Sequence, residues 1–182
     1  MNIKTNYGFS LSKIIIWIAA SSLLVVGGAI GYSYITQNTV SPIPEDIKTQ
    51  LTFSPFVIPK NTKNYSTTDY KFSTAEDKVK ILSYITKFED NTISVSEYSQ
   101  PPEFTEITEY KDRFLSNVIN QYDTVQTVNG MIYLGRATKQ DNKQLGIMIE
   151  RGLLVFMSPS QDLNSNEWRN FGDKLEIQKI DN

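Results

Sequence analysis

A long run without any charged residue near the N-terminus limits what this chain can fold into. No charged side chain occurs between Lys13 and Glu45, and the 22 residues from Ile14 to Ile35 are almost entirely apolar. A helix rises about 1.5 Å per residue, so this run would span about 33 Å, enough to cross a bilayer core about 30 Å thick. Its length and position favour a transmembrane helix over a buried helix of a water-soluble protein.

The basic residues around this run predict its orientation. Lys4 and Lys13 precede it, and the next basic residue is Lys48. Because basic flanks stay in the cytoplasm, we expect the N-terminus inside and the rest of the chain outside. The resulting prediction is a single-pass bacterial cell-membrane protein with a cytoplasmic tail (1–13), a transmembrane helix (14–35), a linker (36–50) and an extracytoplasmic domain (51–182).

Small residues inside the run raise two further hypotheses. Gly27 and Ala29 are spaced like a signal-peptide cleavage site, but the apolar run continues past them, which favours an uncleaved anchor. Gly27 and Gly31 form a G-x-x-x-G motif, at which two helix backbones can approach closely. These two glycines are therefore candidates for self-association in the membrane, unless they only reflect the abundance of small residues in membrane helices.

A second N-terminal motif suggests another class of protein. The residues Gly8–Leu11, followed by a long apolar run, resemble the processing site of type IV prepilins. That family has a glutamate five residues after the cut, where this chain has Lys13. Pro42 and Pro44 would also end the helix early for a pilin stalk. A degenerate pilin-like subunit remains an alternative.

Composition limits the chemistry open to the outer domain. The chain has no histidine and no cysteine, which removes the commonest general base, the commonest metal ligand and all disulfides. Beyond Lys4 and Lys13, 16 basic residues stand against 20 acidic ones. A mildly acidic domain without a basic stripe argues against a nucleic-acid partner.

Alternating and helical patterns predict an α+β domain with an antiparallel sheet of about seven strands and two helices. The helices are expected over 105–121, with Thr105 as cap, and over 165–177, where Asn164 and Glu167 form a capping box. Asn129-Gly130 predicts a hairpin with a type I′ turn, and Arg151-Gly152 predicts a second hairpin. Strands are expected at 53–58, 68–73, 79–86, 92–98, 124–128, 131–138, 145–150 and 153–158.

Several short phrases in this order resemble a group of uncharacterised single-pass membrane proteins of candidate-phylum bacteria. The matching phrases are Pro55–Pro59, Ile93–Glu97, Pro101-Pro102, Thr127–Gly130 and Val155–Pro159. The order of elements is similar to the PsbP-like fold, in which helices flank a sheet. This resemblance implies a domain that binds or supports larger assemblies, and it implies no catalytic residues.

Three groups of side chains are weighed as sites. Asp162, Asn164 and Asn166 are spaced like a calcium loop, but its sixth position is Glu167 and not glycine, so helix capping is favoured. The series Glu103, Glu106 and Glu109 fits one face of a solvated helix start better than a catalytic pair. The serines Ser94, Ser96 and Ser99 have no histidine to activate them.

From these patterns we assign no catalytic, metal or cofactor-binding residue. The prediction is a membrane-anchored binding or assembly module that is not an enzyme and whose partner is an envelope protein. The alternative is a carrier or sensor with an apolar pocket beneath the sheet.

Overall fold

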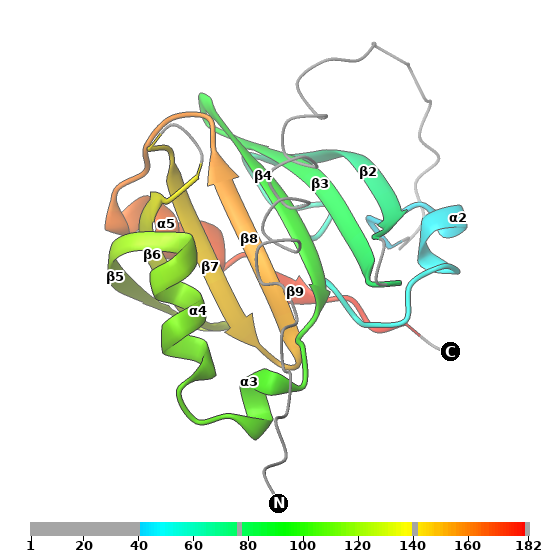
Figure 1. Cartoon of the computed structure of the whole chain (residues 1–182). Coiled ribbons are helices and arrows are strands. Elements are labelled where there is room, and N and C mark those ends of the chain that lie inside the picture. The colour runs from blue at the N-terminus through cyan, green and yellow to red at the C-terminus, as the bar shows by residue number, and fades with distance from the viewer. Residues whose placement is uncertain (1–40, 76–77, 140–141, 181–182) are drawn as a thin grey trace, which may run out of the picture. The chain divides into compact units, whose positions relative to one another are not determined.

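A seven-stranded antiparallel sheet forms the centre of the fold (Figure 1). The computed structural model describes residues 41–75, 78–139 and 142–180. The strand order is β2-β3-β4-β8-β7-β6-β5, which confirms the predicted α+β class and sheet. The strands are β2 (Tyr65–Thr74), β3 (Lys80–Phe88), β4 (Asn91–Ser99), β5 (Ile119–Thr127), β6 (Gly130–Ala137), β7 (Gln144–Glu150) and β8 (Leu153–Pro159).

Four short helices and a small ribbon complete the described part of the chain. The helices are α2 (Glu45–Lys48), α3 (Glu103–Glu106), α4 (Tyr110–Val118) and α5 (Ser165–Gly172). Strand β1 (Phe56–Val57) pairs antiparallel with β9 (Glu176–Ile177), and we call this pair the β1–β9 ribbon. None of the helices in the described ranges has the length and apolarity to cross a bilayer. The expected span 14–35, with Gly27 and Gly31, lies outside the described residues.

The two faces of the sheet are covered differently. The inner face carries one apolar core, which includes Leu82, Tyr84, Ile93 and Val155 and packs against α5. On the outer face, α4 lies in front of β6 (Figure 1), and its Phe114 ring reaches to 6.2 Å from the ring of Phe156 on β8. The segment before the sheet adds seven buried apolar side chains to the inner core: Ile43, Ile47, Leu51, Phe53, Phe56, Val57 and Ile58.

The helix predicted over 105–121 is wrong in its bounds. Ile107 has extended dihedrals (φ −121°, ψ 110°) and ends α3, and α4 starts only at Tyr110. Thr105 does not cap α4, because its hydroxyl donates to the Pro102 carbonyl at 2.8 Å. At the other end the chain turns extended at Ile119, which opens β5 opposite Ala137. Pairing along the sheet edge therefore overrides the helical spacing after Val118.

The second helix is also shorter than predicted, although its start is correct. The Asn164 side chain accepts from the Asn166 and Glu167 amides, and Glu167 Oε2 accepts from the Asn164 amide at 2.6 Å, so the capping box is confirmed. Helix α5 ends at Gly172 instead of residue 177. Residues 176–177 form β9, because they pair with β1.

Both predicted hairpins form, but the turn at Asn129-Gly130 is not type I′. Of these two residues only Gly130 has a positive φ, at 134°. The Asn129 side chain is used elsewhere, donating to the carbonyls of Gly172 and Leu175 at the end of α5. The second hairpin has the two positive φ angles of a type I′ turn, 53° at Arg151 and 74° at Gly152.

Candidate functional site

A fully buried carboxyl group on the inner face is the chemically most unusual feature of the described residues. Glu97 lies on β4 between Leu82 of β3 and Val155 of β8, and none of its surface is exposed. It shares its face with Ile93 and Val95, because side chains alternate along a strand. A charged side chain is costly in such a place unless it is paired or neutral.

Glu97 and Tyr84 together hold the backbone of Phe56. The Phe56 amide donates to Glu97 Oε2 at 2.8 Å, and the Tyr84 hydroxyl donates to the Phe56 carbonyl at 2.9 Å. On its other side β1 pairs with β9, and the Gln178 amide donates to the Pro55 carbonyl at 2.8 Å. Two side chains of the main sheet thus form hydrogen bonds to the backbone at the edge of the β1–β9 ribbon, where a third strand would otherwise pair.

Two further oxygen atoms of this cluster have no hydrogen-bond partner among the described residues. They are Glu97 Oε1 and the hydroxyl of Tyr70, whose ring lies 5.3 Å from that of Tyr84. A buried polar atom without a partner is destabilising, and a carboxylate would be more so than a carboxylic acid. We call Glu97, Tyr84, Tyr70 and Phe56 the Glu97 clasp.

Burial sets the protonation of the clasp. It raises the pKa of Glu97 from 4.5 to about 8, although the hydrogen bond from the Phe56 amide and, after it, the Tyr84 hydroxyl act to lower it. Burial likewise raises the pKa of Tyr84 and of Tyr70, and the neighbouring Glu97 raises both further. Glu97 is therefore mostly a neutral acid at pH 7. A neutral carboxylic acid that is shielded from water and accepts a hydrogen bond from the backbone fits a structural role or a pH-switching role.

Sequence reasoning placed Glu97 in its strand but missed its burial. The signal was present, because Ile93, Val95 and Glu97 occupy alternate positions of one strand. A charged residue in phase with apolar ones marks a buried charge. The same test applied to β3 puts Tyr84 between Leu82 and Thr86, both fully buried.

The outer face of β2, β3 and β4 is rich in hydroxyl groups. Ser83 and Ser96 lie opposite each other on β3 and β4, and their Oγ atoms are 3.0 Å apart. Ser96 is also paired with Phe156 of β8, which marks the change from hydroxyl to aromatic side chains on this face. We call the hydroxyl-bearing positions the serine face: Ser66, Thr68, Ser73, Ser83, Thr92, Ser94, Ser96 and Ser158.

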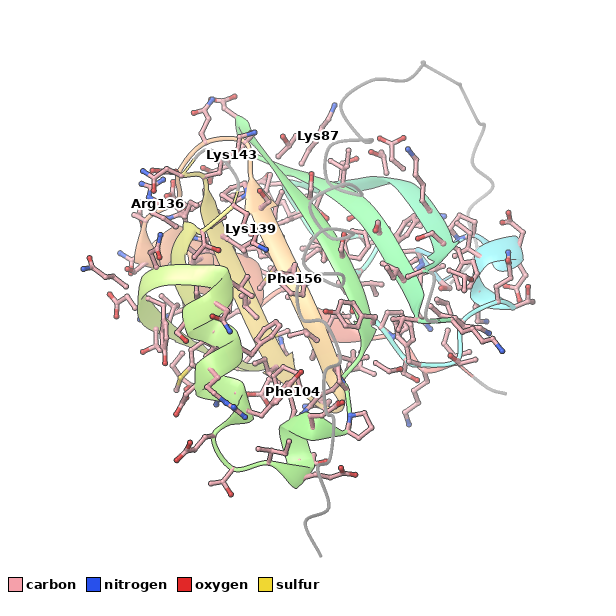
Figure 2. All side chains as sticks on the ribbon, viewed as in Figure 1. Lys87, Phe104, Arg136, Lys139, Lys143 and Phe156 are labelled. Atoms are coloured by element: carbon pink, nitrogen blue, oxygen red, sulfur yellow. The ribbon has the colours of Figure 1, made fainter. Side chains whose placement is uncertain are left out.

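Four basic side chains lie towards the end of the domain away from Phe104 (Figure 2). They are Lys87, Arg136, Lys139 and Lys143. Arg136 forms an ion pair with Asp162, so its charge is neutralised. The neighbouring β3–β4 turn adds Glu89 and Asp90. This end of the domain is mixed in charge and is not a basic patch.

The residues weighed as sites from sequence have local structural partners. Asp162 pairs with Arg136, and Asn164 caps α5. Glu103 and Glu106 lie in α3, whereas Glu109 precedes α4, so the three carboxylates do not share one helix. No group of three acidic residues in the described ranges could hold a metal ion. Ser94 and Ser96 lie on the serine face, and Ser99 ends β4.

Comparison of the chain with protein-family models, curated proteins and solved structures finds no match.

Proposed function

We propose that this chain is a single-pass membrane protein whose extracytoplasmic domain is a non-catalytic binding or assembly module in a bacterial envelope. The observation that carries the proposal is the charge-free run 14–35, with lysines only on its N-terminal side until Lys48. The resemblance to single-pass bacterial proteins with a PsbP-like domain supports the same assignment. The absence of histidine and cysteine from the sequence supports a non-catalytic role.

A short tether would keep the domain near the bilayer. Ile43 is 1% exposed and belongs to the inner core, although it lies within the range predicted as linker. Only residues 36–42 separate it from the apolar run, and seven extended residues reach about 25 Å at most. Pro42 stiffens this stretch further. The proposal therefore calls for a partner that is itself in or next to the membrane.

Because the chain has no cysteine, single cysteines can report the topology. Val128→Cys places a thiol at a side chain that is 76% exposed, and Asn2→Cys places one before the apolar run. The full-length variants are expressed in bacterial cells, and spheroplasts are treated with a membrane-impermeant maleimide. We expect Val128→Cys to be labelled in intact spheroplasts and Asn2→Cys only after lysis.

Fractionation of the same cells provides a second test, which asks whether the chain is anchored in the membrane. The proposal predicts that the full-length chain stays in the membrane pellet after alkaline carbonate washing and is released by detergent. Unprocessed full-length chain in the aqueous fraction would contradict the anchor. Labelling of Asn2→Cys but not Val128→Cys in intact spheroplasts would reverse the orientation and contradict the extracytoplasmic role.

A further inference from the structure

The β1–β9 ribbon pairs residues 56–57 with residues 176–177 and contacts the sheet through the Glu97 clasp. Each of its strands has only two residues, so few backbone hydrogen bonds hold the ribbon together. Phe56 is nevertheless 0% exposed, and its amide and carbonyl are both bonded to the sheet by side chains. The ribbon is thus a small element that is attached to the sheet by two polar side chains in addition to the buried apolar side chains of Phe56 and Val57.

Removing the ribbon would bring water to Glu97. The carboxyl contacts the ribbon through Oε2, while Oε1 has no partner among the described residues. The groups that influence it are the Tyr84 hydroxyl from β3, the Tyr70 hydroxyl from β2 and the Phe56 amide from β1. Its cross-strand neighbours are Leu82 of β3 and Val155 of β8, both uncharged. No basic side chain among these groups offsets a negative charge on Glu97.

We propose that the Glu97 carboxyl is a proton-operated latch, which keeps the β1–β9 ribbon on the sheet while it is neutral and favours release of the ribbon when it ionises. In the closed form the acid keeps its proton in the dry core. In the open form water solvates the carboxylate, and the proton passes to solvent. Opening therefore releases one proton, and the inference is independent of the membrane proposal.

Linkage gives the sign and the range of the effect. Between the ordinary pKa of 4.5 and the raised value of about 8, the closed form binds a proton that the open form has lost. The opening equilibrium then grows by up to tenfold per pH unit. Below this range both forms are protonated and above it both are ionised, so the dependence levels off at each end.

Amide hydrogen exchange of the full-length chain in neutral detergent tests the latch between pH 5 and 9. The reporters are the Phe56 and Gln178 amides, which bond to Glu97 and to Pro55, after correction for the intrinsic pH dependence of exchange. We expect these two amides to open at least tenfold more often than amides in the β4–β8 ladder. We also expect their opening to rise steeply up to about pH 8 and then flatten.

Glu97→Gln is the matched variant, because the amide keeps the shape and an acceptor for Phe56 but cannot ionise. It should make the opening of both reporters independent of pH, whereas Glu176→Gln, at an exposed carboxyl of the same ribbon, should leave the steep rise intact. Tyr84→Phe removes the donor to the Phe56 carbonyl and should increase opening about tenfold at every pH without removing the rise. The latch is refuted if the reporters open only together with the β4–β8 ladder, or if Glu97→Gln keeps the wild-type pH dependence.

Discussion

The two halves of the sheet are buried in different ways. Strands β5 to β8 lie between α4 on the outer face and α5 on the inner face, and β8 is apolar on both faces from Leu153 to Met157. Strands β2 to β4 pack their inner face against the segment 43–58, and their outer face is the serine face. The first half is covered by helices whose buried contacts are mainly apolar, and the second half is covered by the segment 43–58, whose strand β1 is also held by the Glu97 clasp.

This difference indicates which half of the sheet opens more easily. In the half-sheet enclosed by two helices, no carboxyl or basic side chain of the described strands β5 to β8 is buried. The half closed by the β1–β9 ribbon contains an acid whose charge depends on pH near neutrality.

The largest expected effect is in the helix-covered half. Trp168 is 0% exposed, its ring lies against the backbone of Gly146, and its Nε1 donates to the Gln144 side chain at 3.1 Å. Trp168→Ala should lower the free energy of unfolding by about 3–5 kcal/mol, because it removes this contact area and leaves a cavity. Urea denaturation measures the change, and a loss below about 1 kcal/mol would mean that α5 does not close this half.

The second prediction concerns the clasp half and its pH dependence. Glu97 has a raised pKa in the folded protein, so its contribution to stability is complete below pH 4.5 and is lost as the pH rises towards about 8. The free energy of unfolding should fall by at most about 1.4 kcal/mol per pH unit in this range. Denaturation of the wild type and Glu97→Gln at pH 5, 6, 7 and 8 compares the slopes. Parallel slopes would show that another group is responsible.

The third prediction distinguishes helix propensity from packing at the end of α5. Replacing a helical glycine by alanine normally stabilises a helix by about 1 kcal/mol. At Gly172, however, a Cβ would lie 2.6 Å from Thr127 Cγ2 and 2.9 Å from Ile132 Cδ1. Gly172→Ala should therefore destabilise the fold by about 1–3 kcal/mol.

A second substitution provides the control for this result. Thr127→Ser removes the clashing methyl group and keeps the hydroxyl that donates to the Gly130 carbonyl. Combined with Gly172→Ala, it should recover part of the loss in thermal denaturation. A stabilised Gly172→Ala single variant would mean that the helix and sheet are less closely packed than described.

The smallest expected effect is on the serine face. Ser96 is half-buried, and its hydroxyl shares one hydrogen bond with Ser83. Ser96→Ala should cost about 0.5–1.5 kcal/mol, the usual net value of one hydrogen bond. Phe156→Ala, at the neighbouring position of β8, should cost about 3–5 kcal/mol. Equal effects in chemical denaturation would remove the distinction between the two parts of the outer face.

Much of this fold could be predicted from local patterns, and the errors have a common physical cause. Alternation found the strands of the sheet, and Asn164 with Glu167 correctly marked the start of α5. Helix ends were wrong at Ile119 and Glu176, where pairing with Ala137 and Val57 takes over. Those partners are distant in sequence, so no local pattern specifies them.

Only one part of the Glu97 clasp, the burial of Glu97, could be predicted from the sequence. The phase of Glu97 with Ile93 and Val95 indicates that it is buried, but nothing in the sequence indicates that it bonds to Phe56, which is 41 residues away. The prediction of a type I′ turn at Asn129-Gly130 was wrong for the same reason. Its side chain caps the distant end of α5 instead of supporting a type I′ turn.

The state of the Glu97 carboxyl tests the account most directly. Its ¹³C chemical shift can be followed from pH 4 to 10 in the labelled full-length chain, with the resonance assigned by its loss in Glu97→Gln. The account predicts a titration midpoint at about pH 8. A midpoint near the ordinary value of 4.5 would show that water reaches Glu97 and that the clasp is neither dry nor neutral.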